Sequence, residues 1–335
     1  MRNEKLQPQS MAEIAEMLGT SAVSVSLALR NSPEVSQALR DRVRQIAMDS
    51  GFKPRNYQRR SHPVEPKESF IGKIAVIEGM TRSSDPVAQL IMNSVMKRLN
   101  ELKISFAVIL CDDLYENPAL IDGYAGVIYH YCFMPKYLSI LQKIQQVAIM
   151  HEEITLGPCD NYKPCEMMAG ELAAQYLLGQ GFKQMILTWE HRMAYRAATH
   201  PRLEGFRRKV REAGVELVEI AYERNENAKF YLDALGETLK KFKYQAGIFA
   251  FCDQVAYHVC SSLDFLGQKR KLRQLEVISC DNTYMIQNLQ PPLPAVDLHI
   301  ADISARAVDG MLWRLANPQA CYQDVMLKPE LVLPK

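Results

Sequence analysis

Apolar residues recur at helical spacing near the start of the chain and predict a bundle of three short helices. The first runs over 11–18, with Ser10 as its N-cap and Glu13 completing a capping box. The Gly19-Thr20-Ser21 triplet then breaks the pattern, and a second helix rich in small residues follows. The third begins near Ser36 and ends at Gly51. Two short helices joined by a glycine-containing turn are typical of a helix-turn-helix, although a generic three-helix bundle has the same periodicity.

From residue 71 onward, short β-rich runs alternate with amphipathic helical patterns. The predicted strands are 71–78, 105–110, 125–130, 146–150, 184–189, 246–251 and 275–280. The predicted helices are 87–103, 136–145, 166–179, 202–213, 228–242, 253–266 and 301–316. This alternation predicts parallel sheets covered by helices on both faces, and the strands are too many for one sheet. We therefore expect an α/β core of two doubly wound lobes, with ligands beyond the carboxyl ends of the strands.

The division of charge along the chain points to a polyanionic partner for the helical head. Residues 1–62 hold ten Lys and Arg against six Asp and Glu, a net charge of +4, whereas the remainder holds 30 against 32, a net charge of −2. A basic head on a slightly acidic body favours nucleic acid, with a merely solubilising N-terminus as the alternative. Residues 54–69 are polar, contain three prolines and predict a linker.

Composition also excludes several classes of protein. The chain has no apolar run long enough to span a membrane, and its first residues do not form a signal peptide, so we expect a cytoplasmic protein. The eight cysteines are scattered without zinc spacing, which predicts reduced thiols, no metal site and no cofactor. Phosphate-binding glycine loops and a nucleophile elbow are also lacking, so we expect no enzymatic activity.

Residues 10–55 closely resemble the head of the lactose-repressor/galactose-repressor (LacI/GalR) family of transcriptional regulators, and the resemblance continues in order through the core. The similar core segments are IGKIAVI (71–77), RLEGFRRKVREAG (202–214), IFAFCDQVAYHVCSSLDFLG (248–267), VISCDNTYMIQNLQPPLPAVDL (277–298) and MLKPELVLP (326–334). The resemblance implies a homodimer that binds a near-palindromic DNA operator and is controlled by a small-molecule effector, with repression as the expected outcome. A transport-type binding protein without DNA function is the alternative, but such a protein lacks the head.

The resemblance also implies which residues of the head contact DNA. Ser10, Met11 and Ser36 match positions that contact phosphates in the family. The recognition positions fall on Ser21, Ala22, Val23, Ser26, Leu27 and Arg30. Ala22 and Val23 occupy the two positions that most strongly set operator choice.

Two departures from the family pattern concern DNA recognition. Leu27 replaces the usual arginine, so it contacts a thymine methyl group or packs inside the head instead of binding guanine. Ser61 replaces the leucine that wedges into the minor groove and kinks the duplex, which leaves Tyr57 as the only large apolar candidate nearby.

The same resemblance implies an effector pocket in the core. Arg202 and Asp281 match effector-binding positions, and a guanidinium facing a carboxylate can orient vicinal hydroxyls, which favours a sugar. A purely structural ion pair between these two residues is the alternative. Further pocket candidates are Asp85, Trp189, Glu190, His191, Cys252 and Asp253. Cys252 stands where the family has asparagine, and Trp189 suits either a sugar ring or the core.

These observations predict a head over 1–60, a hinge over 61–69 and an effector-binding core over 70–335. Lobe 1 is predicted at about 70–158 and 298–317, and lobe 2 at about 159–296 and 320–335. Because 110–125 is short, lobe 1 is predicted to lack one helix.

Overall fold

The computed structural model describes residues 10–29, 35–50, 72–79, 85–131, 139–151, 159–190, 197–222, 228–267 and 274–334. The chain forms two compact units, Met1–Phe70 and Ile71–Lys335. The predicted hinge, 61–69, lies outside the described residues. None of the described helices has both the length and the apolar content needed to cross a membrane.

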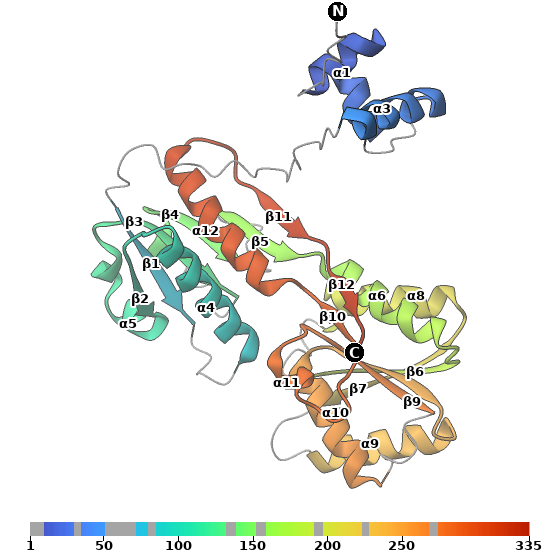
Figure 1. Cartoon of the computed structure of the whole chain (residues 1–335). Helices are drawn as coiled ribbons and strands as arrows, with labels where there is room; N and C mark the ends of the chain where they lie inside the picture. The colour runs from blue at the N-terminus through green and yellow to red at the C-terminus, as the bar shows by residue number, and fades with distance from the viewer. Residues whose placement is uncertain are drawn as a thin grey trace, which may run out of the picture. The chain divides into compact units, whose positions relative to one another are not determined.

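The first unit contains the three predicted helices, α1 (Met11–Leu18), α2 (Ala22–Leu29) and α3 (Gln37–Ser50) (Figure 1). Gly19 ends α1 at φ 60°, a left-handed conformation that glycine adopts without steric cost. Ile14, Ala15, Val25, Ala28 and Val43 form the buried core of the bundle. Each helix thus contributes at least one core residue, as the apolar pattern predicts.

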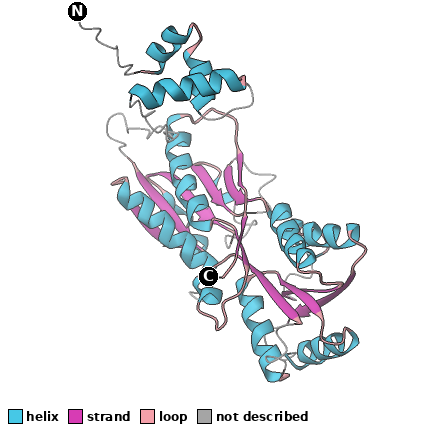
Figure 2. Cartoon of the chain, turned by 45° about the vertical axis from the view of Figure 1, so that its right-hand side comes forward, coloured by secondary structure: helices cyan, strands magenta, loops and turns pink. Residues whose placement is uncertain are grey.

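The second unit consists of two α/β lobes (Figures 1 and 2). The sheet of lobe 1 has the order β11-β5-β4-β3-β1-β2, and all its pairs are parallel. Its strands are β1 (Lys73–Glu78), β2 (Phe106–Leu110), β3 (Tyr124–His130), β4 (Gln145–Ile149), β5 (Asp160–Pro164) and β11 (Asp324–Leu327). The long helices α4 (Pro86–Glu101) and α12 (Ile300–Ala316) pack on one face of this sheet. The other face is covered by α5 (Cys111–Glu116) and the 139–144 segment.

Lobe 2 repeats this arrangement with the strand order β12-β10-β9-β8-β6-β7. Its strands are β6 (Gln184–Glu190), β7 (Glu216–Tyr222), β8 (Ala246–Ala250), β9 (Leu275–Cys280), β10 (Ala295–Asp297) and β12 (Glu330–Val332), of which only β12 runs antiparallel. Helices α6 (Glu166–Gly179) and α8 (Pro201–Glu212) cover one face. Helices α9 (Ala228–Lys241), α10 (Asp253–Phe265) and α11 (Tyr284–Gln287) cover the other.

The structure corrects the predicted lobe boundaries. Strands β5 and β11 hydrogen-bond within the sheet of lobe 1, whereas the sequence pattern placed 159–164 and 320–327 in lobe 2. The chain therefore passes between the lobes after Pro164, after Asp297 and after Leu327. Both strands are short and partly polar, so hydrophobicity alone did not identify them.

Two helix predictions in lobe 1 also need correction. The described part of the helix predicted at 136–145 forms a short 3-10 turn at 139–141 followed by turn residues. The second prediction, that lobe 1 lacks a helix between 110 and 125, is wrong. This segment forms two short helices, α5 and the 3-10 helix η1 (Pro118–Ile121).

Candidate functional site

The second helix of the head presents a face of small side chains to solvent. Ser21, Ala22 and Val23 are exposed, Val23 by 68%, whereas Val25 and Ala28 on the opposite side are fully buried. Ser26 and Leu27 are half-buried between these faces. A helix with small outward side chains can bring its backbone close to base edges in the major groove.

Three serines cap the three helices of the head. The hydroxyl oxygens of Ser10, Ser21 and Ser36 accept hydrogen bonds from the backbone N–H groups of Glu13, Ser24 and Leu39, at 3.2, 3.1 and 3.3 Å. Ser10, Met11 and Ser36 thus lie at helix N-termini, where backbone N–H groups and the helix dipole favour a phosphate. The predicted contacts Arg30 and Tyr57 lie outside the described residues.

In lobe 2, the predicted pair Arg202 and Asp281 meets beside the carboxyl ends of β8 and β9. Arg202 Nη1 lies 3.3 Å from Asp281 Oδ1 and donates to the carbonyl oxygen of Phe251 at 2.6 Å. Both residues are buried, with 3% and 6% of their surface exposed. Asp281 has φ 101°, a strained conformation for a residue other than glycine, and such strain is concentrated at functional sites.

Glu166, which the sequence analysis missed, is the main partner of Arg202. Its two carboxylate oxygens accept hydrogen bonds from Arg202 Nε at 2.7 Å and from Nη2 at 3.1 Å. Although burial alone would lower it, the pKa of Arg202 is held well above its ordinary value by the neighbouring Cys280, Glu166 and Asp281. The sequence feature that points to Glu166 is its place as the first residue of the helix predicted at 166–179.

Two glycines bring the helices of this cluster together. Gly170 on α6 lies so close to α8 that a Cβ atom there would be 1.8 Å from the backbone oxygen of Arg202. In the same way, a Cβ atom at Gly205 on α8 would be 2.1 Å from the backbone oxygen of Met167. The close helix crossing therefore fixes the backbones that carry Glu166 and Arg202.

Cys252 and Glu190 belong to the same neighbourhood. Burial raises the pKa of the Cys252 thiol, and the nearby carboxylates of Asp281 and Glu190 raise it further. Cys252 precedes α10 as its N-cap residue without a side-chain hydrogen bond to the helix. The thiol is therefore protonated and uncharged at neutral pH, and it cannot replace the acceptor oxygen of an asparagine.

Asp253 has structural contacts in place of a free carboxylate. It accepts hydrogen bonds from the Ser279 hydroxyl and from the backbone N–H of Thr283, and so ties α10 to the segment after β9. Burial raises the pKa of Asp253 to about 6, although the bonds from Ser279 and Thr283 lower it. These contacts favour a positioning role beside Asp281.

Trp189 is directed toward the neighbouring edge strand. Its indole Nε1 donates to Glu219 Oε2 on β7 at 3.3 Å, and the same carboxylate pairs with Arg207 on α8. These contacts favour a packing role for the ring. His191 lies outside the described residues.

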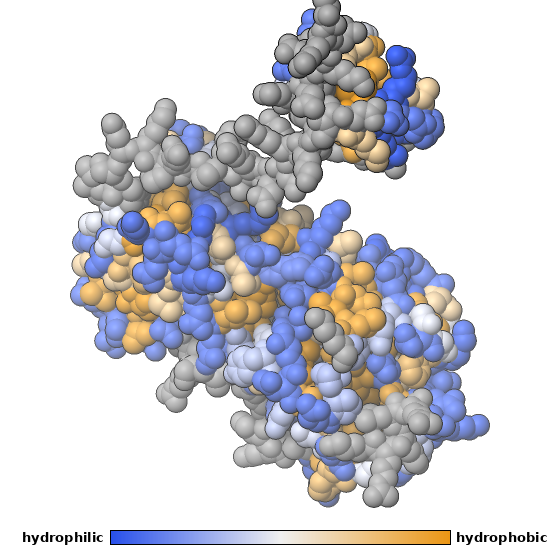
Figure 3. Space-filling model, in the orientation of Figure 1, coloured by the Kyte–Doolittle hydropathy of each residue, from blue (hydrophilic) through white to orange (hydrophobic). Residues whose placement is uncertain are grey.

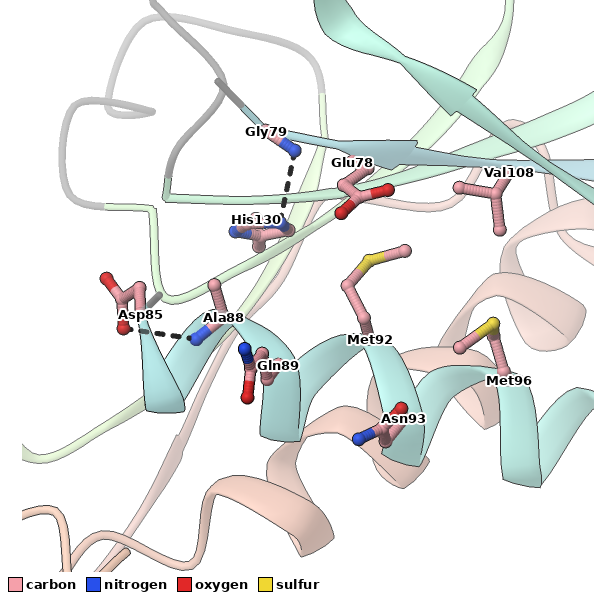
Figure 4. Close-up of a pocket in the computed structure, with 10 residues that line it drawn as sticks. All are labelled: Glu78, Gly79, Asp85, Ala88, Gln89, Met92, Asn93, Met96, Val108 and His130. Carbon is pink, nitrogen blue, oxygen red and sulfur yellow. Dashed lines mark hydrogen bonds between the residues drawn. The ribbon is translucent and has the colours of Figure 1, made fainter. Parts of the chain in front are cut away.

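Asp85 lies in lobe 1, where it lines a pocket of about 340 Å³ between α4, β1 and β2 (Figure 4). Its carboxylate caps α4 through the N–H groups of Val87 and Ala88, at 3.0 and 3.4 Å, and accepts a 2.6 Å bond from the Tyr131 hydroxyl. His130 is buried behind it, and burial lowers the pKa of His130 to about 4, so this imidazole is neutral. Among the described residues, no group of His, Cys, Asp and Glu is arranged to hold a metal ion.

Comparison with known proteins places both units of the chain. Residues 10–55 match the bacterial regulatory proteins of the lacI family, and residues 174–333 match a periplasmic binding protein-like domain. The HTH-type transcriptional regulator DegA of Bacillus subtilis (strain 168) is 23% identical over 337 residues, covering 96% of each chain. The HTH-type transcriptional repressor PurR of Vibrio vulnificus (strain CMCP6) is 24% identical over 240 residues, covering 71% of this chain and 66% of that protein.

Solved structures share the fold. A complex of the transcriptional regulator CelR with cellobiose superposes with a TM-score of 0.66 at 15% identity, over 98% of this chain and 99% of the other. The lac repressor dimer bound to operator and the anti-inducer ONPF superposes with a TM-score of 0.62 at 16% identity, over 98% of both chains. With its helix-turn-helix head and its two-lobed core, the chain belongs to the lacI family of DNA-binding transcription regulators.

Proposed function

We propose that this chain binds a near-palindromic operator as a homodimer in the cytoplasm, and that a small molecule bound by the core, a sugar, changes its affinity for that operator. The observation that carries this proposal is the exposed face of α2, where small residues and Val23 lie opposite a fully buried side. The complex of CelR with cellobiose among the structural relatives supports a sugar as the effector class.

Substitution of Val23 tests the role of α2 in reading sequence. We expect Val23→Ala to change which operators bind best, because an apolar side chain contacts thymine methyl groups and its loss removes that preference. The expected change is about 1–3 kcal/mol at the base pairs involved. The measurement is the affinity of the full chain for a panel of operator fragments at one fixed salt concentration.

Met48→Ala is the matched control for this experiment. Met48 is also an exposed apolar residue of the head, 77% exposed, but it lies near the end of α3. We expect it to leave the ranking of fragments unchanged. If both variants change the ranking in the same way, α2 is not the helix that reads sequence.

The edge of the lobe 1 sheet supports the proposed dimer. Val108 and Leu110 on the edge strand β2 are 39% and 49% exposed, and Met92 and Met96 of α4 line the adjoining pocket. Apolar patches also lie among hydrophilic side chains on the face of the core seen in Figure 3. An edge strand with exposed apolar side chains is a surface that a second copy can cover.

We expect Leu110→Asp to convert the protein to monomers and to weaken operator binding by about 100-fold or more, because two linked heads bind with high effective concentration. The backbone tolerates aspartate here, since Leu110 is the N-cap residue of α5. Met326→Asp is the control, because Met326 is 60% exposed on β11 at the opposite edge of the same sheet. Sedimentation shows the mass, and a dimeric Leu110→Asp variant would exclude this face as the interface.

A further inference from the structure

The guanidinium of Arg202 is almost fully engaged by the protein itself. Its Nε and Nη2 donate to the two oxygens of Glu166, and its Nη1 donates to Phe251 O and Asp281 Oδ1. An arginine has five N–H groups in a planar fork, so these four bonds leave little capacity for a ligand. Its side chain is only 4% exposed.

Glu166 occupies the side of Arg202 that would otherwise bind an anion. Paired bonds to Nε and one Nη are the geometry in which arginine binds a carboxylate or a phosphate of a ligand. The Glu166 side chain is 14% exposed, and the crossing of α6 and α8 at Gly170 and Gly205 fixes its distance from Arg202. The pair is therefore a built feature of lobe 2 and not a surface contact.

The charges around the pair disfavour a further anion. Burial raises the pKa of Asp281 well above its ordinary value; Arg202 opposes this rise, and the carboxylates of Asp253 and Glu166 add to it. Among the described residues of this cluster, the single guanidinium group of Arg202 thus faces several carboxyl groups. Their oxygens are acceptors, and a ligand binds them through hydroxyl or ammonium donors.

We infer that Glu166 determines the specificity of the effector site: by occupying the fork of Arg202, it excludes ligands with a carboxylate or phosphate there and selects a polyhydroxy or amino compound. This inference rests on the proposed function, because it names the chemistry that the same core recognises. In this inference, the role of Arg202 is to hold the side chains of Glu166 and Asp281 in place.

Inorganic phosphate is the probe that tests this inference. In the Glu166→Ala variant, Nε and Nη2 of Arg202 lose their partner and gain room for an anion. We expect phosphate to raise the Tm of this full-length variant by about 2–4 °C relative to sodium chloride of equal ionic strength. The wild type should show no such rise. Adding Arg202→Met to Glu166→Ala should abolish the response.

Glu171→Ala is the matched control. Glu171 lies on the same helix and also pairs with an arginine of α8, Arg208, but that arginine is 47% exposed. This variant removes the same charge and should not respond to phosphate.

The isosteric Glu166→Gln variant guards against failure of Glu166→Ala to fold, and it should respond to phosphate more than the wild type does. The inference would be overturned if phosphate raised the Tm of the wild type as much as that of Glu166→Ala, or if it left the Tm of the Glu166 variants unchanged. This experiment contains no DNA, so its outcome does not depend on operator binding. A failure of the proposed function can therefore be distinguished from a failure of this inference.

Discussion

Replacing Gly170 by alanine is expected to destabilise the core by about 3 kcal/mol or more, because the added methyl group meets backbone and not a flexible side chain. The new Cβ atom would lie 1.8 Å from the backbone oxygen of Arg202 and 2.8 Å from the backbone nitrogen of Phe206. Helices α6 and α8 must separate to accept it, and this separation also pulls Glu166 away from Arg202. Chemical denaturation of the full chain measures the loss.

Gly179→Ala is the control for this prediction. Gly179 is the last residue of the same helix, and a Cβ atom there would meet nothing within 4 Å. The change should alter stability by no more than about 1 kcal/mol. If Gly170→Ala is as stable as Gly179→Ala, the close helix crossing does not hold the site together.

Replacing Arg202 by methionine is expected to destabilise lobe 2 by about 3–5 kcal/mol, because it leaves the Glu166 carboxylate buried without its cation and the Asp281 carboxyl group without its hydrogen-bond donor. Arg207→Met is the matched control on the same helix. Arg207 also makes paired bonds to one glutamate, Glu219, but that carboxylate is 32% exposed and solvent stabilises it when the pair is broken. We expect the Arg207 variant to lose about 1 kcal/mol or less.

Comparing the two arginine variants decides between the interpretations that the sequence left open for Arg202. A large loss of stability in Arg202→Met supports the structural ion pair with Asp281 and Glu166. An Arg202 variant as stable as the Arg207 variant would instead make Arg202 a ligand-binding group whose contacts contribute little to folding. The double variant Glu166→Gln with Arg202→Met should recover part of the loss, since it removes the buried Glu166 charge that has lost its cation.

The sequence predicted the architecture well where the apolar pattern is strong. The head helices, their caps at Ser10 and Ser36, and the central strands of both sheets follow the predicted positions within a few residues. Buried parallel strands such as β8 are almost entirely apolar, which makes them easy to recognise. The strands that were missed are short or polar, as in Asp160–Pro164, or alternate with charged residues on an edge, as in β7.

The candidate site was predicted less completely, because a linear pattern does not show which polar groups are already paired. The resemblance identified Arg202 and Asp281, and the structure brings them together. The resemblance could not show that Glu166 binds the guanidinium of Arg202, or that the Asp85 carboxylate caps a helix. Both outcomes depend on contacts between residues distant in sequence or on local helix geometry.

The effect of a sugar on operator affinity tests the central claim most directly. The measurement is the fluorescence anisotropy of an operator fragment selected from genomic DNA. The full chain is added to this fragment with and without a sugar that raises the Tm of the chain. We expect the saturating sugar to change operator affinity by about 5- to 150-fold and to leave affinity for unrelated DNA unchanged. A chain that binds every DNA fragment equally, or whose operator affinity is the same with and without the bound sugar, would contradict the account.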